Sequence, residues 1–217
     1  MPERYRVVSS GPLSYLLSVP QDVRPAGALL PVLCFLHGYG EAAPRDIRRA
    51  LTLHGPLKPT SSPRATRQFI VVAPQLRVAG DIWLNYADAL RDIVAQVNAE
   101  HGGDPRRSYL TGFSFGANGV LDLGARQPLV WAALWAVDPT RLPAKGARPP
   151  VWVSLGDISR ARREVFASAL EVRAADRELA GDCYYSDDGE DHAGTATLAY
   201  KDERIYRWLL SKASSGG

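Results

Sequence analysis

The stretch Tyr109-Leu-Thr-Gly-Phe-Ser-Phe-Gly-Ala-Asn-Gly119 contains a serine, Ser114, with a glycine two residues away on each side. Glycines at these positions let the backbone pass close to the serine and tolerate a strained turn. Aromatic and β-branched residues predict a short buried strand at 107–113, and apolar spacing predicts a helix at 115–126. A serine on a tight turn between a strand and a helix is the setting of a nucleophile. The alternative is an ordinary glycine-rich turn with a capping serine.

Strand and helix patterns alternate along most of the chain. Continuous apolar runs at 31–36 and 69–73 predict strands covered on both faces. The clearest helix is predicted at 81–100, with apolar residues on one face. This alternation predicts an α/β fold with a mostly parallel central sheet of about eight strands and helices on both faces. The other predicted elements are strands at 5–9, 13–19, 131–137, 151–155 and 183–186, and helices near 162–180 and 199–212.

Length and composition indicate an ordinary globular protein. The 217 residues predict one domain over 1–213 and a disordered tail at 214–217. A net charge of +3 is too small to indicate a nucleic-acid partner, and no apolar run approaches the length of a membrane span. The first six residues hold no apolar signal core, so a cytoplasmic location is expected. Cys34 and Cys183 fall on predicted strands far apart in the sheet and are expected to be reduced. The sequence indicates no oligomeric state.

Chemistry in a parallel sheet of this kind gathers outside the carboxyl ends of the strands. A serine hydroxyl needs a neighbouring base to take its proton, and a carboxylate must hold that base in the right tautomer. Serine, histidine and aspartate all occur directly after predicted strands. These positions are His37-Gly-Tyr-Gly40, Pro74-Gln75, Ser114, Asp138, Asp157 and the loop 187–194.

The expected base is His192. It is the one histidine of the four that lies between the last predicted strand and the last predicted helix. The chain order of Ser114, an acid and then His192 is the order expected for this architecture. The alternative is a solvated loop histidine among acidic residues.

The turn His37-Gly38-Tyr39-Gly40 follows an apolar strand. Its expected contribution is a backbone N–H, that of Tyr39, which together with the N–H of Phe115 would face a developing oxyanion. The alternative is a glycine turn with no catalytic duty.

Several motifs together resemble the α/β-hydrolase superfamily. The likeness is greatest to its small serine esterase branch of predicted peptidases, phospholipase/carboxylesterase-like proteins and polyhydroxybutyrate-depolymerase-like esterases. It spans roughly residues 30–211 and implies a serine hydrolase that cleaves esters through an acyl-enzyme, with no metal or cofactor. The motifs are Leu36-His37-Gly38-x-Gly40, His54-Gly-Pro56, Tyr109-Leu-Thr-Gly-Phe-Ser-Phe-Gly116, Asp191-His192, Ala199-Tyr200 and Tyr206-Arg-Trp-Leu-Leu210.

The carboxylate departs from the pattern of that branch. There, the preceding strand ends in His-Gly and the aspartate follows about three residues later, whereas here Leu155-Gly156 is followed at once by Asp157. Asp157 is the expected acid, since it stands at the right strand end, and Asp138 after the preceding strand is the alternative. An acidic residue of the 187–191 loop, or no acid, also stays open. Asp157 could instead cap a helix, and Asp138 could be a turn residue.

Aromatic residues near the strand ends could line a substrate pocket, although most aromatics at such spacings belong to the core. The pocket candidates are Trp83 and Trp135, with Tyr39, Phe113 and Phe115 similarly placed. By family resemblance His54 borders the pocket, or else it is a packed histidine. Three arginines after the expected acid (Arg160, Arg162 and Arg163) could favour an anionic substrate.

The segment between 132 and 151 leaves no room for a large lid, so an open site for short or medium acyl or aryl esters is expected. A small-molecule ester is the expected partner. The alternatives are a peptidase or feruloyl-type esterase of the same fold, and a non-catalytic binding protein with this fold.

Overall fold

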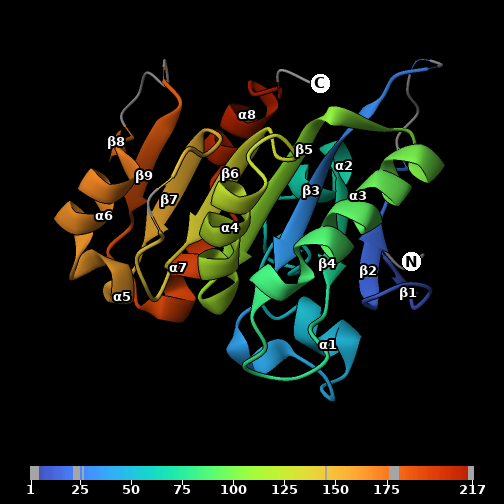
Figure 1. Cartoon of the computed structure of the whole chain (residues 1–217), viewed down its shortest axis with the longest axis horizontal. Helices are drawn as coiled ribbons and strands as arrows, with labels where there is room; N and C mark the ends of the chain where they lie inside the picture. The colour runs from blue at the N-terminus through green and yellow to red at the C-terminus, as the bar shows by residue number, and fades with distance from the viewer. Residues whose placement is uncertain (1–4, 22–24, 26, 145, 176–180, 215–217) are drawn as a thin grey trace.

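The structure, a computed structural model, describes residues 5–21, 25, 27–144, 146–175 and 181–214. The strands of this described part are β1 Arg6–Val8, β2 Tyr15–Ser18, β3 Leu30–Leu36, β4 Ile70–Pro74, β5 Gly103–Phe113, β6 Ala133–Val137, β7 Val151–Leu155, β8 Arg173–Ala174 and β9 Cys183–Asp187. They form one sheet in the order β1-β2-β4-β3-β5-β6-β7-β9-β8 (Figure 1). Strand β2 pairs antiparallel with both β1 and β4. All the other pairs, along the order β4-β3-β5-β6-β7-β9-β8, are parallel. The predicted α/β fold is confirmed.

Helices cover both faces of the sheet. The described helices are η1 Tyr39–Glu41, α1 Ile47–Leu51, α2 Arg64–Gln68, η2 Trp83–Tyr86, α3 Ala87–His101, α4 Phe115–Arg126, α5 Asp157–Arg160, α6 Arg163–Leu170, α7 His192–Ala199 and α8 Glu203–Leu210. Apolar side chains of α3, α4 and α6 pack on one face, and those of α1, α2, α7 and α8 pack on the other. In Figure 1, α3 and α4 lie in front of the sheet and α2 and α8 lie behind it.

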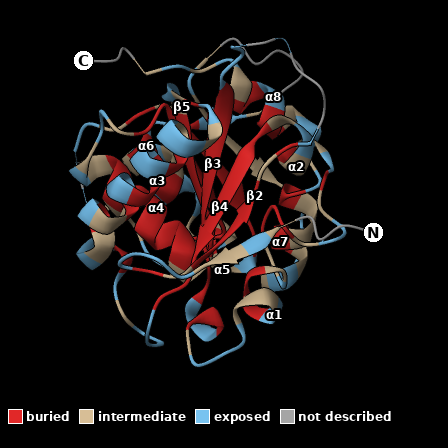
Figure 2. Cartoon of the chain, turned by 90° about the vertical axis from the view of Figure 1, so that its right-hand side faces the viewer, coloured by how far each residue is buried: buried red, intermediate tan, exposed pale blue. Residues whose placement is uncertain are grey.

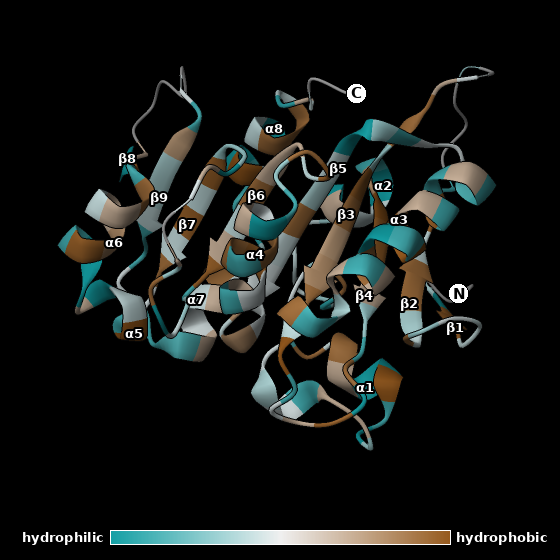
Figure 3. Cartoon of the chain, in the orientation of Figure 1, coloured by the Kyte–Doolittle hydropathy of each residue, from teal (hydrophilic) through white to brown (hydrophobic). Residues whose placement is uncertain are grey.

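The core follows from the alternation of side chains along each strand. In β3, Val32 and Cys34 pack with α3 and α4, whereas Leu33 and Phe35 point to the opposite face. Both sets are fully buried, which explains why this strand reads as an unbroken apolar run. Buried residues accordingly fill the central strands in Figure 2, and polar residues mark the outer helix surfaces in Figure 3.

Two predicted helices have different bounds in the structure. The helix expected near 162–180 ends at Leu170, because Glu171 adopts a left-handed conformation with φ 53°. The chain then forms β8, which pairs with β9 and adds a ninth strand to the eight expected; residues 176–180 lie outside the described residues. The helix expected near 199–212 is the shorter α8, Glu203–Leu210, because α7 ends at Ala199 and Asp202 caps the start of α8 with its side chain. The helix predicted at 81–100 is confirmed as η2 followed by α3.

The carboxyl ends of the parallel strands lie together at the lower edge in Figure 1, beside α1, α5 and the start of α7. Between β6 and β7, the described residues 138–144 and 146–150 form no helix or strand, in keeping with the expected absence of a large lid. Of the tail expected to be disordered, Ser214 donates its N–H to the Arg106 carbonyl, and residues 215–217 lie outside the described residues. Within the described ranges no helix is both long and apolar enough to cross a bilayer.

Candidate active site

Ser114 stands at the turn between β5 and α4, as expected from the glycine spacing. Its backbone has φ 57° and ψ −118°, a region that L-residues rarely enter. The two flanking glycines are required by close packing: a Cβ at Gly116 would overlap the Leu36 carbonyl oxygen, and one at Gly112 would lie 2.6 Å from the Gly116 carbonyl. The turn is therefore pressed against β3, and the strained serine is held by its surroundings.

His192 is brought to Ser114 by the loop after β9, as its first helical residue in α7. Its Nε2 lies 2.8 Å from Oγ of Ser114, within hydrogen-bond distance. The imidazole also rests on the Phe113 ring, with the two ring centres 4.5 Å apart. Asp191 caps α7 by accepting the Gly194 N–H. The predicted pairing of Ser114 with His192 thus has the geometry that a nucleophile and its base require.

The carboxylate partner of His192 is Asp138, at the end of β6. Its Oδ2 lies 2.6 Å from Nδ1 of His192. Its Oδ1 accepts hydrogen bonds from the Gly156 N–H at 3.0 Å, the Ser159 N–H at 2.9 Å and the Ser159 hydroxyl at 2.5 Å. Burial raises the pKa of Asp138, but the hydrogen bonds from His192, Ser159 and Gly156 outweigh it and hold the pKa below its ordinary value. Asp138 is therefore a buried carboxylate that stays ionised.

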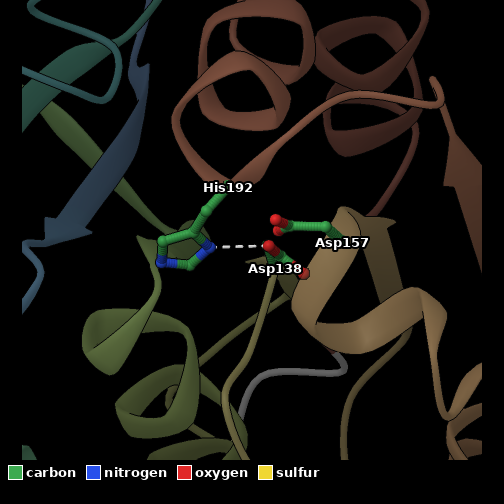
Figure 4. Close-up of side chains that lie close together, drawn as sticks. All are labelled: Asp138, Asp157 and His192. Carbon is green, nitrogen blue, oxygen red and sulfur yellow. Dashed lines mark hydrogen bonds and ion pairs between the residues drawn. The ribbon is translucent and has the colours of Figure 1, made fainter.

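This geometry corrects the expected role of Asp157. Asp157 is exposed at the start of α5, and the hydrogen bonds of the described residues include none between it and His192. Figure 4 shows the Asp157 carboxylate beside that of Asp138. The dashed line that marks the hydrogen bond joins His192 to Asp138. The two carboxylates are both near His192, with donor atoms of all three residues within 4.8 Å of one another, but Asp138 is buried and held by Gly156 and Ser159, whereas Asp157 is exposed. The alternative acid in the sequence is the one that reaches the histidine.

Asp138, Asp157 and His192 also offer donor atoms within 4.8 Å of one another, close enough in principle for a metal ion. Two of the three residues, however, are already joined by the Nδ1–Oδ2 hydrogen bond. Nδ1 of His192 and Oδ2 of Asp138 are thus hydrogen-bonded to each other, and Asp157 supplies the third donor of the set.

The predicted oxyanion donors lie at the starts of two helices. Tyr39 is the first residue of η1 and Phe115 the first of α4, so neither N–H has a partner within its own helix. The two turns are adjacent, since a Cβ at Gly38 would lie 3.6 Å from Cβ of Ser114. The rings of Tyr39 and Phe115 meet edge to face at 6.0 Å. The two turns that carry these amides thus lie next to Ser114.

His37 supports this turn as a neutral side chain. Its Nδ1 donates to the Gly38 carbonyl at 2.6 Å, and its Nε2 accepts the Leu76 N–H at 3.0 Å. Burial lowers the pKa of His37 to about 4, against the opposing effect of the Gly38 hydrogen bond. One nitrogen donates and the other accepts, which is the hydrogen-bonding pattern of a neutral imidazole.

Of the predicted pocket residues, both tryptophans are buried, and Trp83 also lines a small pocket with Phe115 beside α4. Trp83 is 1% exposed, packs against the His37 ring and donates its indole N–H to the His37 carbonyl at 3.2 Å. Trp135 is fully buried and donates to the Ser154 hydroxyl at 3.2 Å. Because Trp135 lies on the face covered by α8, the prediction that it lines a substrate pocket is wrong.

His54 is close to the predicted triad. Its ring packs on Phe113 at 4.7 Å, on the same phenylalanine that His192 contacts. Its Nδ1 is buried and has no hydrogen-bond partner in the described structure. Burial, followed by the charges of Lys58, His192 and Arg45, lowers the pKa of His54 to about 4. A neutral histidine therefore borders the site.

The three arginines predicted to favour an anionic substrate differ in their partners. Arg160 binds the Asp187 carboxylate at 2.8 Å and the Glu190 carbonyl at 3.0 Å, so it fastens the loop that carries His192. Arg162 donates to the Thr140 carbonyl at 2.7 Å, and Arg163 pairs with Glu164. The guanidinium groups bind the chain itself. Cys34 and Cys183 are both free thiols, as expected.

Glu41 and Ser159 belong to the site and have no counterpart among the predicted residues. Glu41 accepts the Gly38 N–H at 2.6 Å, and Ser159 binds Asp138. A signal for Glu41 is present in the sequence: it stands three residues after Gly38, the spacing at which a glutamate can reach back to the start of a helix.

The fold is that of α/β-hydrolases, shared with solved structures of esterases and serine hydrolases. A thermostable esterase is similar with a TM-score of 0.71 and 20% identity, over 97% of this chain and 63% of its own. S-formylglutathione hydrolase from Staphylococcus aureus follows with a TM-score of 0.66 and 13% identity, over 95% and 96% of the two chains. The feruloyl esterase module from Clostridium thermocellum has a TM-score of 0.65 and 13% identity, over 93% and 87%. No family model matches the chain, and no curated protein matches it in sequence.

At these identities the likeness establishes the fold, and activity has to be argued from the site itself. The chain spans less than two thirds of the length of the thermostable esterase.

Proposed function

We propose that the protein is a serine hydrolase that cleaves short to medium acyl or aryl carboxylic esters through an acyl-enzyme intermediate. The observation that carries the proposal is the connected series Ser114 Oγ, His192 Nε2, His192 Nδ1 and Asp138 Oδ2, with separations of 2.8 and 2.6 Å. This connectivity is that of a nucleophile, a base and an orienting acid. A non-catalytic binding protein was suggested by the displaced acid, and the Asp138–His192 hydrogen bond removes that argument.

In the first half-reaction, Oγ of Ser114 attacks the ester carbonyl carbon while His192 Nε2 takes the hydroxyl proton. The imidazolium that forms is stabilised by ionised Asp138, which also holds Nδ1 protonated so that Nε2 is free to act as the base. His192 then donates its proton to the leaving alcohol oxygen as the carbon–oxygen bond breaks. In the second half-reaction a water gives a proton to His192 and attacks the acyl carbon. His192 then returns that proton to Oγ of Ser114 as the bond between Oγ and the acyl carbon breaks and the acid is released.

The negative charge that develops on the carbonyl oxygen would be held by the amide N–H groups of Tyr39 and Phe115. Both are first residues of helices, so neither N–H is used within its own helix, and that of Phe115 lies at the positive end of the twelve-residue α4. Each such donor contributes about 3 kcal/mol to transition-state stabilisation. The placement of these two turns therefore matters as much as the triad itself.

The substrate is proposed to be small because the site is open. Tyr39 is 60% exposed and packs edge to face with Phe115, which provides an apolar surface next to the serine for an acyl or aryl group. The β6–β7 connection contributes no helix to cover the site in its described residues. An aryl ester of the feruloyl type is the second candidate, favoured by the structural likeness to a feruloyl esterase module.

A fluorophosphonate probe tests the proposal directly. It is expected to label the parent protein at Ser114, and p-nitrophenyl acetate or butyrate is expected to be hydrolysed. Ser114→Ala should lose both reactions, whereas the exposed control Ser168→Ala should keep both. Absence of labelling in the folded parent would overturn the proposal.

A substrate panel then separates the two candidates. Alkyl, aryl and feruloyl esters are compared by kcat/KM at one pH. A kcat/KM for feruloyl esters that is tenfold or more above that for p-nitrophenyl butyrate would favour the feruloyl-type esterase. The cytoplasmic location, the single-domain organisation over residues 1–213 and the absence of a nucleic-acid partner stay predictions.

A further inference from the structure

The two peptide groups on either side of Gly38 are each held by hydrogen bonds. In the group that joins His37 to Gly38, the carbonyl accepts the indole N–H of Trp83 at 3.2 Å. The N–H of the same group donates to Oε2 of Glu41 at 2.6 Å. Both ends of this peptide are thus fixed by buried side chains.

The next peptide group joins Gly38 to Tyr39 and carries the proposed oxyanion donor. Its carbonyl accepts from Nδ1 of His37 at 2.6 Å and from the N–H of Glu41 at 3.3 Å. In a planar trans peptide the C=O and N–H point in opposite directions. Holding the Gly38 carbonyl therefore also sets the direction of the Tyr39 N–H.

Glu41 is an unusual residue for this position. Its side chain is buried, with the residue 4% exposed, and charged residues are rarely buried without a partner. Oε2 binds Gly38, while Oε1 is buried with no hydrogen-bond partner in the described structure. Arg45 on the following loop and the Tyr200 phenol at the end of α7 are the charged and titratable groups that interact with it. Such a carboxylate contributes little to stability and needs another explanation.

We propose that Glu41 is a positioning residue for the oxyanion site, and that its ionised carboxylate holds the Gly38–Tyr39 turn so that the Tyr39 amide points at the substrate carbonyl oxygen. This inference rests on the proposed serine hydrolase function. A hydrogen bond to an ionised acceptor is about twice as strong as one to a neutral acceptor. Protonation of Glu41 therefore loosens the turn.

The proposal has a consequence for pH dependence. Burial raises the pKa of Glu41 to about 7, against the lowering effects of the Gly38 hydrogen bond and Arg45. Catalysis then falls on the acid side for two reasons: His192 must be neutral to act as the base, and protonation of Glu41 loosens the turn and lowers kcat by about as much as Glu41→Gln does. Replacing Glu41 by a neutral residue of the same shape removes the ionisation of Glu41 and leaves that of His192 in place.

Glu41→Gln provides the kinetic test, with the exposed Glu164→Gln as the matched control. In Glu41→Gln, kcat for p-nitrophenyl butyrate is expected to fall about tenfold with KM within about twofold, since the loss concerns the transition state. In a plot of log kcat against pH, the slope on the acid side is expected to exceed 1 in the parent and in Glu164→Gln, because two groups take up protons. The slope is expected to be 1 in Glu41→Gln. Unchanged kcat and an unchanged pH profile in a folded Glu41→Gln protein would overturn the proposal.

A second readout does not depend on catalysis or on a variant that folds. The amide proton of Gly38 in ¹⁵N-labelled parent protein is expected to titrate with a midpoint near that of Glu41, at about pH 7. A Gly38 amide signal that does not move between pH 5 and 8 would overturn the proposal. A parent that hydrolyses no ester and reacts with no fluorophosphonate would instead refute the proposed function, while the Gly38 titration still decides whether Glu41 holds the turn.

Discussion

The carboxylate of Asp138 lies 2.6 Å from Nδ1 of His192, a residue 54 positions further along the chain. Asp138 ends β6 in a left-handed conformation with φ 45°, which few residues other than glycine adopt. Its Oδ1 accepts hydrogen bonds from Gly156, which follows β7, and from Ser159 in α5. A Cβ at Gly156 would lie 2.5 Å from Oδ2 of Asp138, so only glycine lets the chain close over this carboxylate. The position of the Asp138 carboxylate therefore depends on the ends of two strands, β6 and β7.

The first prediction separates the two aspartates. Asp138→Asn is expected to lower kcat/KM for a p-nitrophenyl ester by about 10³- to 10⁴-fold, because an amide favours the wrong tautomer of the histidine. Asp157→Asn removes an exposed carboxylate with no hydrogen bond to His192 and is expected to change kcat/KM by less than about threefold. A collapse of activity in Asp157→Asn alone would show that the acid assignment is wrong. Thermal unfolding of both variants checks that the fold is kept.

The second prediction concerns stability at mildly acid pH. Folding lowers the pKa of His37 and of His54 from 6.5 to about 4, so both take up protons on unfolding between pH 5 and 6. Folding raises the pKa of Glu41 from 4.5 to about 7, so Glu41 releases a proton on unfolding in the same range. The two histidines outnumber the glutamate, and the free energy of unfolding is therefore expected to fall as pH is lowered, by about 1 kcal/mol per pH unit.

Glu41→Gln removes the proton that Glu41 releases on unfolding. The free energy of unfolding should then fall more steeply as pH is lowered, by about 2.5 kcal/mol per pH unit. Urea unfolding at several pH values between 5 and 6 measures both slopes. Equal slopes in parent and variant would contradict the assignment of Glu41 as a group protonated in the folded state at these pH values. The contribution of Asp138 lies lower: its pKa is depressed on folding, so its stabilisation is present above the unfolded pKa of about 3.9 and is lost only in stronger acid.

The third prediction tests the close packing of the serine turn. Gly116→Ala places a methyl group on the Leu36 carbonyl oxygen, a backbone atom that cannot move aside, and is expected to destabilise the fold by about 3 kcal/mol or more. Gly40→Ala is the control, since its Cβ would meet nothing within 4 Å. Chemical denaturation measures both. Equal stability of the two variants would mean that the turn is looser than the structure has it.

The fourth prediction distinguishes core from pocket. Trp135→Phe leaves a gap in the core and removes the indole hydrogen bond to the Ser154 hydroxyl, and is expected to lower the free energy of unfolding by about 2 kcal/mol with KM unchanged. Tyr39→Ala should do the reverse: Tyr39 is 60% exposed, so stability is kept while KM for aryl esters rises several-fold. A rise of KM in Trp135→Phe would return this tryptophan to the substrate pocket.

Much of the fold and two members of the proposed triad could be predicted from local patterns. The glycines around Ser114 specify a turn that no larger residue allows, and alternating strand and helix patterns predict a parallel sheet whose carboxyl ends gather the chemistry. His192 follows from chain order, because it is the histidine after the last strand. The glycine turn, the strand and helix patterns and the position of His192 can each be recognised in a short segment, because each depends on the residue types of that segment.

The choice between Asp138 and Asp157 was decided only by the tertiary structure. Both follow a buried strand, and what separates them is that Asp138 is buried and held by Gly156 and Ser159 with one oxygen on His192, while Asp157 is exposed and has no hydrogen bond to His192 among the described residues. The burial of Trp135 and the hydrogen bond from Gly38 to Glu41 likewise depend on which elements pack together. Sequence determined which groups could react, because reactivity belongs to side chains; the fold decided which of them meet, because distances of a few ångströms between segments far apart in the chain are set by strand order and packing.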